Sequence, residues 1–243
     1  MIAIIGTTSD DILYFKAKMG NPKEVTLTGG FKVYQGSIFR EDCIVAATGP
    51  SLVDAGIIMT LIIEKFDPYM VFNVGSVYSF SDELRQGDLF IADRYFYADI
   101  DFTDNKEGVY GQIPGRDPFF VADNLINDRA EKNAYLMTTR YVQRGFLLSG
   151  SSFYFMPNKV STIVQNHFLV QEENMRAYDN TSAAIAMVCH LNNTALLTIK
   201  GVAMQMGKER ERINYLRTGL EMMPTIGKII TRILVARTED VNE

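Results

Sequence analysis

The chain has 243 residues, of which 47% are hydrophobic, and its formal net charge is −5. This length fits one large α/β domain with an ample core. The negative charge and scattered Lys and Arg exclude a nucleic-acid-binding surface, which requires clustered cations.

The two cysteines, Cys43 and Cys189, each lie in an apolar run. This placement indicates buried free thiols rather than a disulfide framework. The chain starts Met-Ile-Ala-Ile-Ile-Gly without a basic segment, and its longest apolar run, Ile57–Ile63, is far shorter than the roughly 20 residues of a membrane-spanning helix. We therefore expect a cytoplasmic protein with no membrane partner.

The first third of the chain alternates short apolar runs with turns. Met1–Ile5 is predicted to be a strand that Gly6 ends, and Asp10–Met19 a helix. Thr26–Thr28 and Phe31–Phe39 flank a Gly-Gly pair and are predicted to form a hairpin.

The middle of the chain continues this alternation. Cys43–Ala47 is predicted to be a buried strand, and Leu52–Phe66 a helix that ends before Asp-Pro. Met70–Val74 is predicted to be a strand leading into a Gly-Ser turn, and two further segments rich in β-formers are predicted strands: Leu89–Tyr97 and Arg140–Leu148.

The last third is expected to hold a helix, a core strand and a terminal helix. Asp179–Leu191 has a small-residue helical face, and Thr194–Ile199 is predicted to be the last core strand. The terminal helix is expected to bend at Pro224 and to carry one apolar stripe. The stripe residues are Leu220, Met223, Ile226, Ile230 and Ile233.

Strands that alternate with helices, several of them fully apolar, predict one α/β domain over residues 1–243, with a mixed, mostly parallel sheet covered by helices on both faces. Ligands bind beyond the carboxyl ends of strands in such sheets. The corresponding loops are Gly6–Asp11, Gly49–Leu52, Gly75–Ser79, Gly150–Phe153 and the segment after Lys200.

Common catalytic and cofactor motifs are absent from the sequence. There is no phosphate-binding Walker loop, dinucleotide fingerprint or G-x-S-x-G elbow. His167 and His190 have no Cys or carboxylate neighbours at metal-ligand spacing. We therefore expect neither a metal nor a cofactor.

Ordered motifs along residues 1 to about 205 resemble those of the 5′-methylthioadenosine/S-adenosylhomocysteine nucleosidases, within the nucleoside phosphorylase superfamily. The motifs are Ile4-Ile5-Gly6, Asn73-Val74-Gly75-Ser76, Gly87-Asp88-Leu89, Tyr97-Ala98-Asp99-Ile100-Asp101, Tyr110-Gly111-Gln112-Ile113-Pro114-Gly115, Ser149-Gly150 with Phe153, and Ala184-Ile185-Ala186-Met187-Val188-Cys189-His190. Each motif is weak alone, but the ordered set is specific.

The resemblance implies a homodimer that binds a purine nucleoside. It places Phe153 against the purine, with Ser152 and Tyr154 beside it, and Asp179-Asn180-Thr181 under the ribose. The loop with Tyr110 and Pro114 is implied to line the 5′-substituent pocket of the neighbouring subunit.

Phosphorylases hold a phosphate dianion with guanidinium or ammonium groups. The segments Gly6–Asp11, Gly49–Leu52 and Asn73–Phe80 contain no Arg or Lys. Water, rather than phosphate, is therefore the expected nucleophile.

The sequence departs from the family pattern at the residues that would break the N-glycosidic bond. In the resemblance, the family's purine-protonating Asp aligns with Met204, and the Glu of its ribose-binding Met-Glu pair aligns with Thr181. Asp11 replaces the water-activating Glu and is a weak candidate for that role. The family's Ala-Gly-Gly after Gly-Ser becomes Val77-Tyr78-Ser79, which narrows the base site beside Ser76.

Three functions remain open. The first is a divergent nucleosidase that binds a purine nucleoside with weak or lost hydrolysis, because both carboxylates are replaced. The second is an active N-glycosidase on a different nucleoside, with Asp179, Asp10 or Asp99 as the acid. The third is a structural dimer whose pocket is filled by Tyr78 and Met204.

Individual residues also have purely structural interpretations. Met204 can be core filler, and Asp11 a helix-start acid. Phe153 can be a core aromatic, and Tyr110 with Pro114 a plain surface turn.

Overall fold

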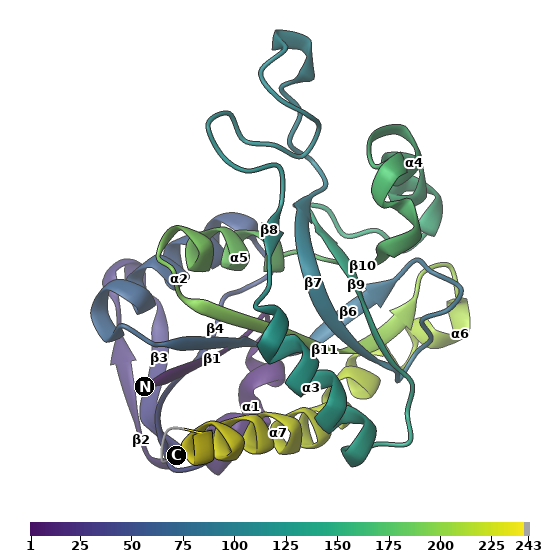
Figure 1. Ribbon diagram of the computed structural model, residues 1–243. Coiled ribbons are helices and arrows are strands. Elements are labelled where there is room, and N and C mark those ends of the chain that lie inside the picture. The colour runs from purple at the N-terminus through teal and green to yellow at the C-terminus, as the bar shows by residue number, and fades with distance from the viewer. Residues whose placement is uncertain (241–243) are drawn as a thin grey trace.

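The computed structural model describes residues 1–240 and has one central sheet with helices on both faces (Figure 1). The strands are β1 (Ile2–Gly6), β2 (Gly20–Thr26), β3 (Lys32–Ile38), β4 (Glu41–Ala47), β5 (Met70–Asn73), β6 (Ser76–Ser79), β7 (Leu89–Tyr97), β8 (Phe120–Val121), β9 (Val142–Ser149), β10 (Met175–Asp179) and β11 (Ala195–Gln205). The helices are α1 (Ser9–Lys18), α2 (Leu52–Phe66), α3 (Asn124–Met137), α4 (Pro157–His167), α5 (Ser182–Leu191), α6 (Glu209–Arg212) and α7 (Tyr215–Asp240).

The sheet is mixed, with strand order β2-β3-β4-β1-β5-β11-β6-β10-β9-β7-β8. At its centre β1, β4, β5 and β11 pair in parallel, and their apolar side chains are buried on both faces. An antiparallel pairing of β11 with β7 closes β11, β6, β10, β9 and β7 into a ring. The predicted fold class is therefore confirmed.

Two apolar layers cover the two faces of the sheet. On one face α2 and α5 pack together through buried side chains such as Ile58, Ile62 and Ala184. On the other face α1, α3 and α7 pack on the same strands, with Phe15 and Ile230 in that core. Figure 1 shows the helix pair α2 and α5 on the side of the sheet opposite α3 and α7.

Most predicted elements match the structure closely. Leu52–Phe66 and Leu89–Tyr97 have the predicted bounds as α2 and β7. The hairpin turns at Gly29 and Gly30, whose φ angles of 79° and 81° favour glycine.

Other predictions need correction. The first strand of the hairpin, expected at Thr26–Thr28, runs from Gly20 to Thr26 as β2. The helix expected from Asp179 begins at Ser182, because Asp179 ends β10, and the strand expected to end at Ile199 continues to Gln205. β6 occupies the segment taken as a loop after Gly75. Helices α3 and α4 were not predicted because their sequences are much less hydrophobic overall than those of α2 and α5.

The terminal helix carries the expected stripe with one exception. Met223, Ile226, Ile230 and Ile233 are at most 2% exposed, whereas Leu220 is half-buried and faces a cleft. α7 continues as one helix through Pro224. No helix within residues 1–240 is both long and apolar enough to cross a membrane.

Candidate functional site

The first turn of α1 fixes a carboxylate beside the end of β1. The backbone N–H of Asp11 donates to Thr8 Oγ1 (3.2 Å), and the backbone N–H of Thr8 donates to Asp11 Oδ2 (2.8 Å), which forms a capping box. The Thr8 hydroxyl also donates to Asp11 Oδ2 (2.9 Å). Asp11 is only 4% exposed, so this local motif sets the position of its carboxylate.

The turn between β5 and β6 brings Ser76 to this carboxylate. Gly75 has a φ of +115°, and a Cβ there would lie 2.7 Å from Asp11 Cγ. Only glycine satisfies the backbone angle and the close approach together. α7 also comes close, since a Cβ at Gly219 would collide with Ser76 Oγ.

A second carboxylate lies at the end of β10, and it is fully paired. Asp179 Oδ2 accepts hydrogen bonds from Lys200 Nζ (2.7 Å) and from the Ser182 hydroxyl. Its Oδ1 accepts from the Ser149 hydroxyl (2.6 Å) and from the backbone N–H groups of Thr181 (3.2 Å) and Ser182 (3.1 Å). Lys200 is wholly buried, so the ion pair is shielded from water.

These contacts decide the charge of Asp179. Burial alone would raise the pKa of its carboxyl, but the Lys200 ammonium and the serine hydroxyls outweigh that effect and hold the pKa below its ordinary value. Asp179 is therefore ionised at neutral pH.

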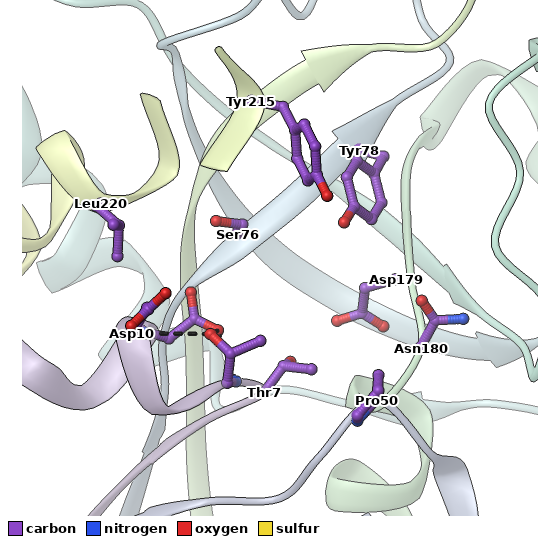
Figure 2. A pocket seen from close by; sticks show the side chains of 11 residues that line it. Thr7, Asp10, Pro50, Ser76, Tyr78, Asp179, Asn180, Tyr215 and Leu220 are labelled. Atoms are coloured by element: carbon purple, nitrogen blue, oxygen red, sulfur yellow. Dashed lines mark hydrogen bonds between the residues drawn. The ribbon is translucent and has the colours of Figure 1, made fainter. Parts of the chain in front are cut away.

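The two carboxylate regions face one cleft at the carboxyl ends of the strands (Figure 2). The cleft contains about 600 Å³ of space, part of it open to solvent. It is lined by Thr7, Thr8, Asp10, Asp11, Pro50, Ser76, Tyr78, Asp179, Asn180, Tyr215 and Leu220.

One end of the cleft is aromatic. Figure 2 shows the rings of Tyr78 and Tyr215 side by side, and their centroids are 6.3 Å apart. Phe153 lies on the other side of Tyr78, edge-to-face at 5.1 Å. Burial raises the pKa of the Tyr78 phenol far above its ordinary value. That phenol stays protonated throughout the neutral range.

Three hydroxyl groups in the cleft are available to a ligand. Within residues 1–240 the hydroxyls of Ser76, Tyr78 and Tyr215 make no hydrogen bond. Asn180, in contrast, donates from Nδ2 to the carbonyl oxygens of Gly150 (2.6 Å) and Ser152 (3.0 Å), so its amide is anchored.

Three residues expected at the site are buried in the core and do not line the cleft. They are Val77, Thr181 and Met204, each 0% exposed. The Thr181 hydroxyl lies 3.1 Å from the Thr7 hydroxyl. Met204 of β11 is the register partner of Tyr78 in β6, so these two residues are neighbours across the strand pair. The Tyr78 side chain lines the cleft, whereas that of Met204 does not.

The segment after β9 lies beyond the aromatic end. Phe153 is 53% exposed and touches Tyr78 rather than the cleft. Ser152 contributes its carbonyl oxygen, which accepts from Tyr178 (2.6 Å), and Tyr154 packs on Tyr178 with centroids 5.4 Å apart.

The loop expected to serve a neighbouring subunit lies apart from the cleft. Tyr110 stacks on His167 with centroids 3.7 Å apart and donates to the carbonyl oxygen of Ala98 (2.7 Å). Pro114 is exposed. Asp99, considered above as an acid, is also exposed and accepts from the backbone N–H of Ser151 (2.6 Å).

Sequence reasoning missed several residues of the cleft. Tyr215 and Leu220 belong to the terminal helix, which was predicted from its apolar stripe alone. Lys200 was noted only as the start of a loop, although a lysine inside a run of buried β-formers signals a buried acidic partner.

The lining sets the chemistry that the cleft supports. It contains carboxylates and hydroxyls but no Lys or Arg, so nothing in it neutralises a phosphate dianion. Among the described residues, no group of three or more His, Cys, Asp or Glu is placed to hold a metal ion.

Comparisons with known proteins show the family of the chain. The model of the Phosphorylase superfamily matches residues 1–234. The 5′-methylthioadenosine/S-adenosylhomocysteine nucleosidase of Bacillus thuringiensis subsp. konkukian is 31% identical over 209 residues, covering 86% of this chain and 87% of that protein. The protein of the same name from Anoxybacillus flavithermus is 29% identical over 208 residues, with the same coverage.

A solved structure of the same family superposes on almost the entire chain. The nucleosidase from Neisseria meningitidis, crystallised in complex with methylthio-immucillin-A, superposes with a TM-score of 0.85 at 25% identity, covering 96% of this chain and 97% of the other. The chain belongs to the phosphorylase superfamily and, within it, to the 5′-methylthioadenosine/S-adenosylhomocysteine nucleosidases.

Proposed function

We propose that this protein binds a purine nucleoside in the cleft at the strand ends and that it cleaves methylthioadenosine or S-adenosylhomocysteine weakly or not at all. One observation carries the proposal: the cleft retains Asp11 beside Ser76, whereas Met204, aligned with the family's acid, is buried in the core. A thioether donates no proton to a leaving purine. General acid catalysis is worth about 10²–10⁴-fold, and the expected loss in rate is of that size.

Water is the proposed nucleophile for whatever hydrolysis remains. The cleft lining has no Lys or Arg, and Lys200 behind it is committed to Asp179. A phosphate dianion would therefore meet carboxylates without a compensating cation.

The test measures binding and cleavage separately. Isothermal calorimetry with methylthioadenosine and S-adenosylhomocysteine should give a saturable heat, and chromatography should detect little adenine at high protein concentration, with or without phosphate. A turnover number in the ordinary range of about 1–10³ s⁻¹ would contradict the weak hydrolysis. Absence of any binding would contradict the assignment of the cleft.

An active N-glycosidase for a different nucleoside is the second candidate. It is favoured by Asp11, whose carboxylate lies at the cleft wall and is a candidate base for activating water. Of the three acids considered for it, Asp179 is ionised by its pairing and Asp99 lies away from the cleft. Asp10 is exposed at the end of the cleft opposite the tyrosines in Figure 2.

A purely structural role is less well supported. It required Tyr78 and Met204 to fill the pocket, but the cleft stays open beside Tyr78 and Met204 does not line it. The free hydroxyl groups at its wall also favour a polar ligand.

The proposal includes a homodimer. Exposed apolar side chains gather on α2, α5 and the neighbouring β8 segment, where Val53 is 69%, Ile57 44%, Val121 52% and Leu191 44% exposed. Light scattering after gel filtration should give twice the monomer mass. Val53→Glu with Ile57→Glu should give the monomer, and Leu125→Glu, on the opposite helical layer, should leave the mass unchanged. A wild-type monomer at tens of micromolar would contradict the dimer.

A further inference from the structure

The two ends of the cleft differ in what they offer a nucleoside. Tyr78 and Tyr215 provide flat rings at one end, where a planar base packs well. Asp11 and Ser76 provide oxygen atoms along the rest of the cleft wall, where sugar hydroxyls find partners. A bound N-riboside therefore places its base against the phenols.

No strong acid lies at the aromatic end. The phenol of Tyr78 has a raised pKa, so it donates a hydrogen bond but does not transfer its proton to a base at neutral pH. Met204, the nearest residue across the strand pair, has no proton to give. A neutral purine therefore leaves from this site without protonation, as an anion.

The electrostatics of the cleft oppose an anion. Asp10, Asp11 and Asp179 contribute three carboxylates, and only the last has an ammonium partner, Lys200. The lining contains no other cation. A departing anionic base is destabilised here, whereas a cation is attracted by the carboxylates and by the faces of the two rings.

We infer that the substrates this cleft hydrolyses are N-ribosides whose base already carries a fixed positive charge, such as N7-alkylated purine or pyridinium ribosides. The inference rests on the proposed function and names the substrate class of the same site. Such a base needs no proton donor, because it leaves as a neutral molecule.

The reaction then uses only groups that the cleft provides. The bond from C1′ to the ring nitrogen breaks, and its electron pair goes to that nitrogen and cancels the positive charge. A water molecule bonds to C1′, and its proton passes to the Asp11 carboxylate and on to solvent. The products are ribose, the neutral base and one proton. Before it takes the proton, the Asp11 carboxylate also stabilises the positive charge that builds up on the ribosyl group.

The experiment compares cationic with neutral ribosides, and 7-methylguanosine and guanosine form a matched pair that differs by one methyl group. Base release from 7-methylguanosine and nicotinamide riboside is compared with release from guanosine and adenosine by chromatography, each rate divided by the uncatalysed rate under the same conditions. We expect the rate enhancement for the cationic ribosides to exceed that for the neutral ones by at least about 100-fold, the lower end of what an acid supplies.

Two variants assign the activity to the cleft. Asp11→Asn should reduce cleavage of 7-methylguanosine by about 100-fold or more. Asp104→Asn removes the same charge at an exposed position of the 3₁₀ turn Thr103–Asn105, which does not line the cleft, and should leave the rate unchanged. Equal losses in both variants, or no loss in Asp11→Asn, would overturn the inference.

The remaining outcomes separate this inference from the proposed function. Equal rate enhancements for guanosine and 7-methylguanosine would reveal a proton donor and overturn the inference, although the protein would still be a hydrolase. Calorimetric binding of methylthioadenosine without cleavage of any cationic riboside would overturn the inference and leave the proposed binding function intact. If neither class of riboside binds, both are wrong.

Discussion

Replacing Lys200 with methionine tests the buried ion pair at the back of the cleft. Methionine keeps most of the side-chain volume but removes the ammonium that lies 2.7 Å from Asp179 Oδ2, and Asp179 is left charged in a site that is 3% exposed. Removing one partner of a buried pair costs about 3–5 kcal/mol. We expect Lys200→Met to lower the free energy of unfolding by that amount at pH 7.5, measured by urea denaturation with circular dichroism.

The pH dependence gives the prediction a second readout. In the wild type the pKa of Asp179 is below its ordinary value of 3.8, so its contribution to stability is present above pH 4 and is lost as the pH falls through the folded-state pKa. In Lys200→Met burial prevails and raises that pKa. The carboxylate then destabilises the protein at neutral pH, and the penalty disappears as the pH falls and the group is protonated. The difference between the two proteins should therefore shrink between pH 7.5 and pH 4.5.

Two controls isolate the charge effect. The double variant Lys200→Met with Asp179→Asn should recover part of the lost stability, because no buried charge remains. Lys32→Met breaks an exposed pair with Glu24, in which the side chains are 61% and 44% exposed, and should leave stability unchanged within error. A loss below about 1 kcal/mol for Lys200→Met, or the same loss at both pH values, would refute the reasoning.

Three other predictions concern backbone conformation, helix capping and the buried thiols. Gly75→Ala should lower the free energy of unfolding by about 1–3 kcal/mol, because residue 75 has a positive φ and a Cβ there would collide with Asp11. Gly56→Ala, in α2 with open space around it, should raise the free energy of unfolding by about 0.5–1 kcal/mol. Urea denaturation of both variants tests these opposite signs, and equal effects would contradict the backbone argument. Thr8→Ala removes the N-terminal cap of α1 and should lower the free energy of unfolding by about 1 kcal/mol in the same assay. An unchanged urea midpoint would contradict this prediction. Burial raises the pKa of Cys189 to about 12 and that of Cys43 further, so neither thiol of the native protein should react with a thiol reagent at pH 8. In the urea-unfolded chain both thiols should react, which gives two equivalents of labelled cysteine. Rapid labelling of the native protein would place a thiol at the surface.

Local sequence patterns were sufficient for much of the fold. The apolar run Met70–Phe72 and the helical spacing in Leu52–Phe66 indicate burial directly, because a strand or helix in the core must hide one face or both. The Gly75 turn was equally readable, since glycine marks a backbone that other residues avoid. The sequence also predicted that the cleft lining would lack Lys and Arg, because three of the loops expected at the strand ends contain neither residue.

The chemistry of the site depended on contacts between distant segments. The sequence offered Asp179, Asp10 and Asp99 as possible acids, and only the structure pairs Asp179 with Lys200. Tyr215 lines the cleft because α7 packs on β11 and β6. The residues next to Tyr215 in the sequence do not predict this contact.

The same limit applies to residue 204, the position that the resemblance aligns with the family's acid. The sequence determined that residue 204 is a methionine, and the structure decided that it is buried beside Tyr78, whose phenol reaches the cleft from the paired strand. Periodicity records how much of a side chain is hidden, because burial is averaged over all neighbours. It does not record which neighbour is charged or protonated, because those partners meet only when β6, β10, β11 and α7 pack together.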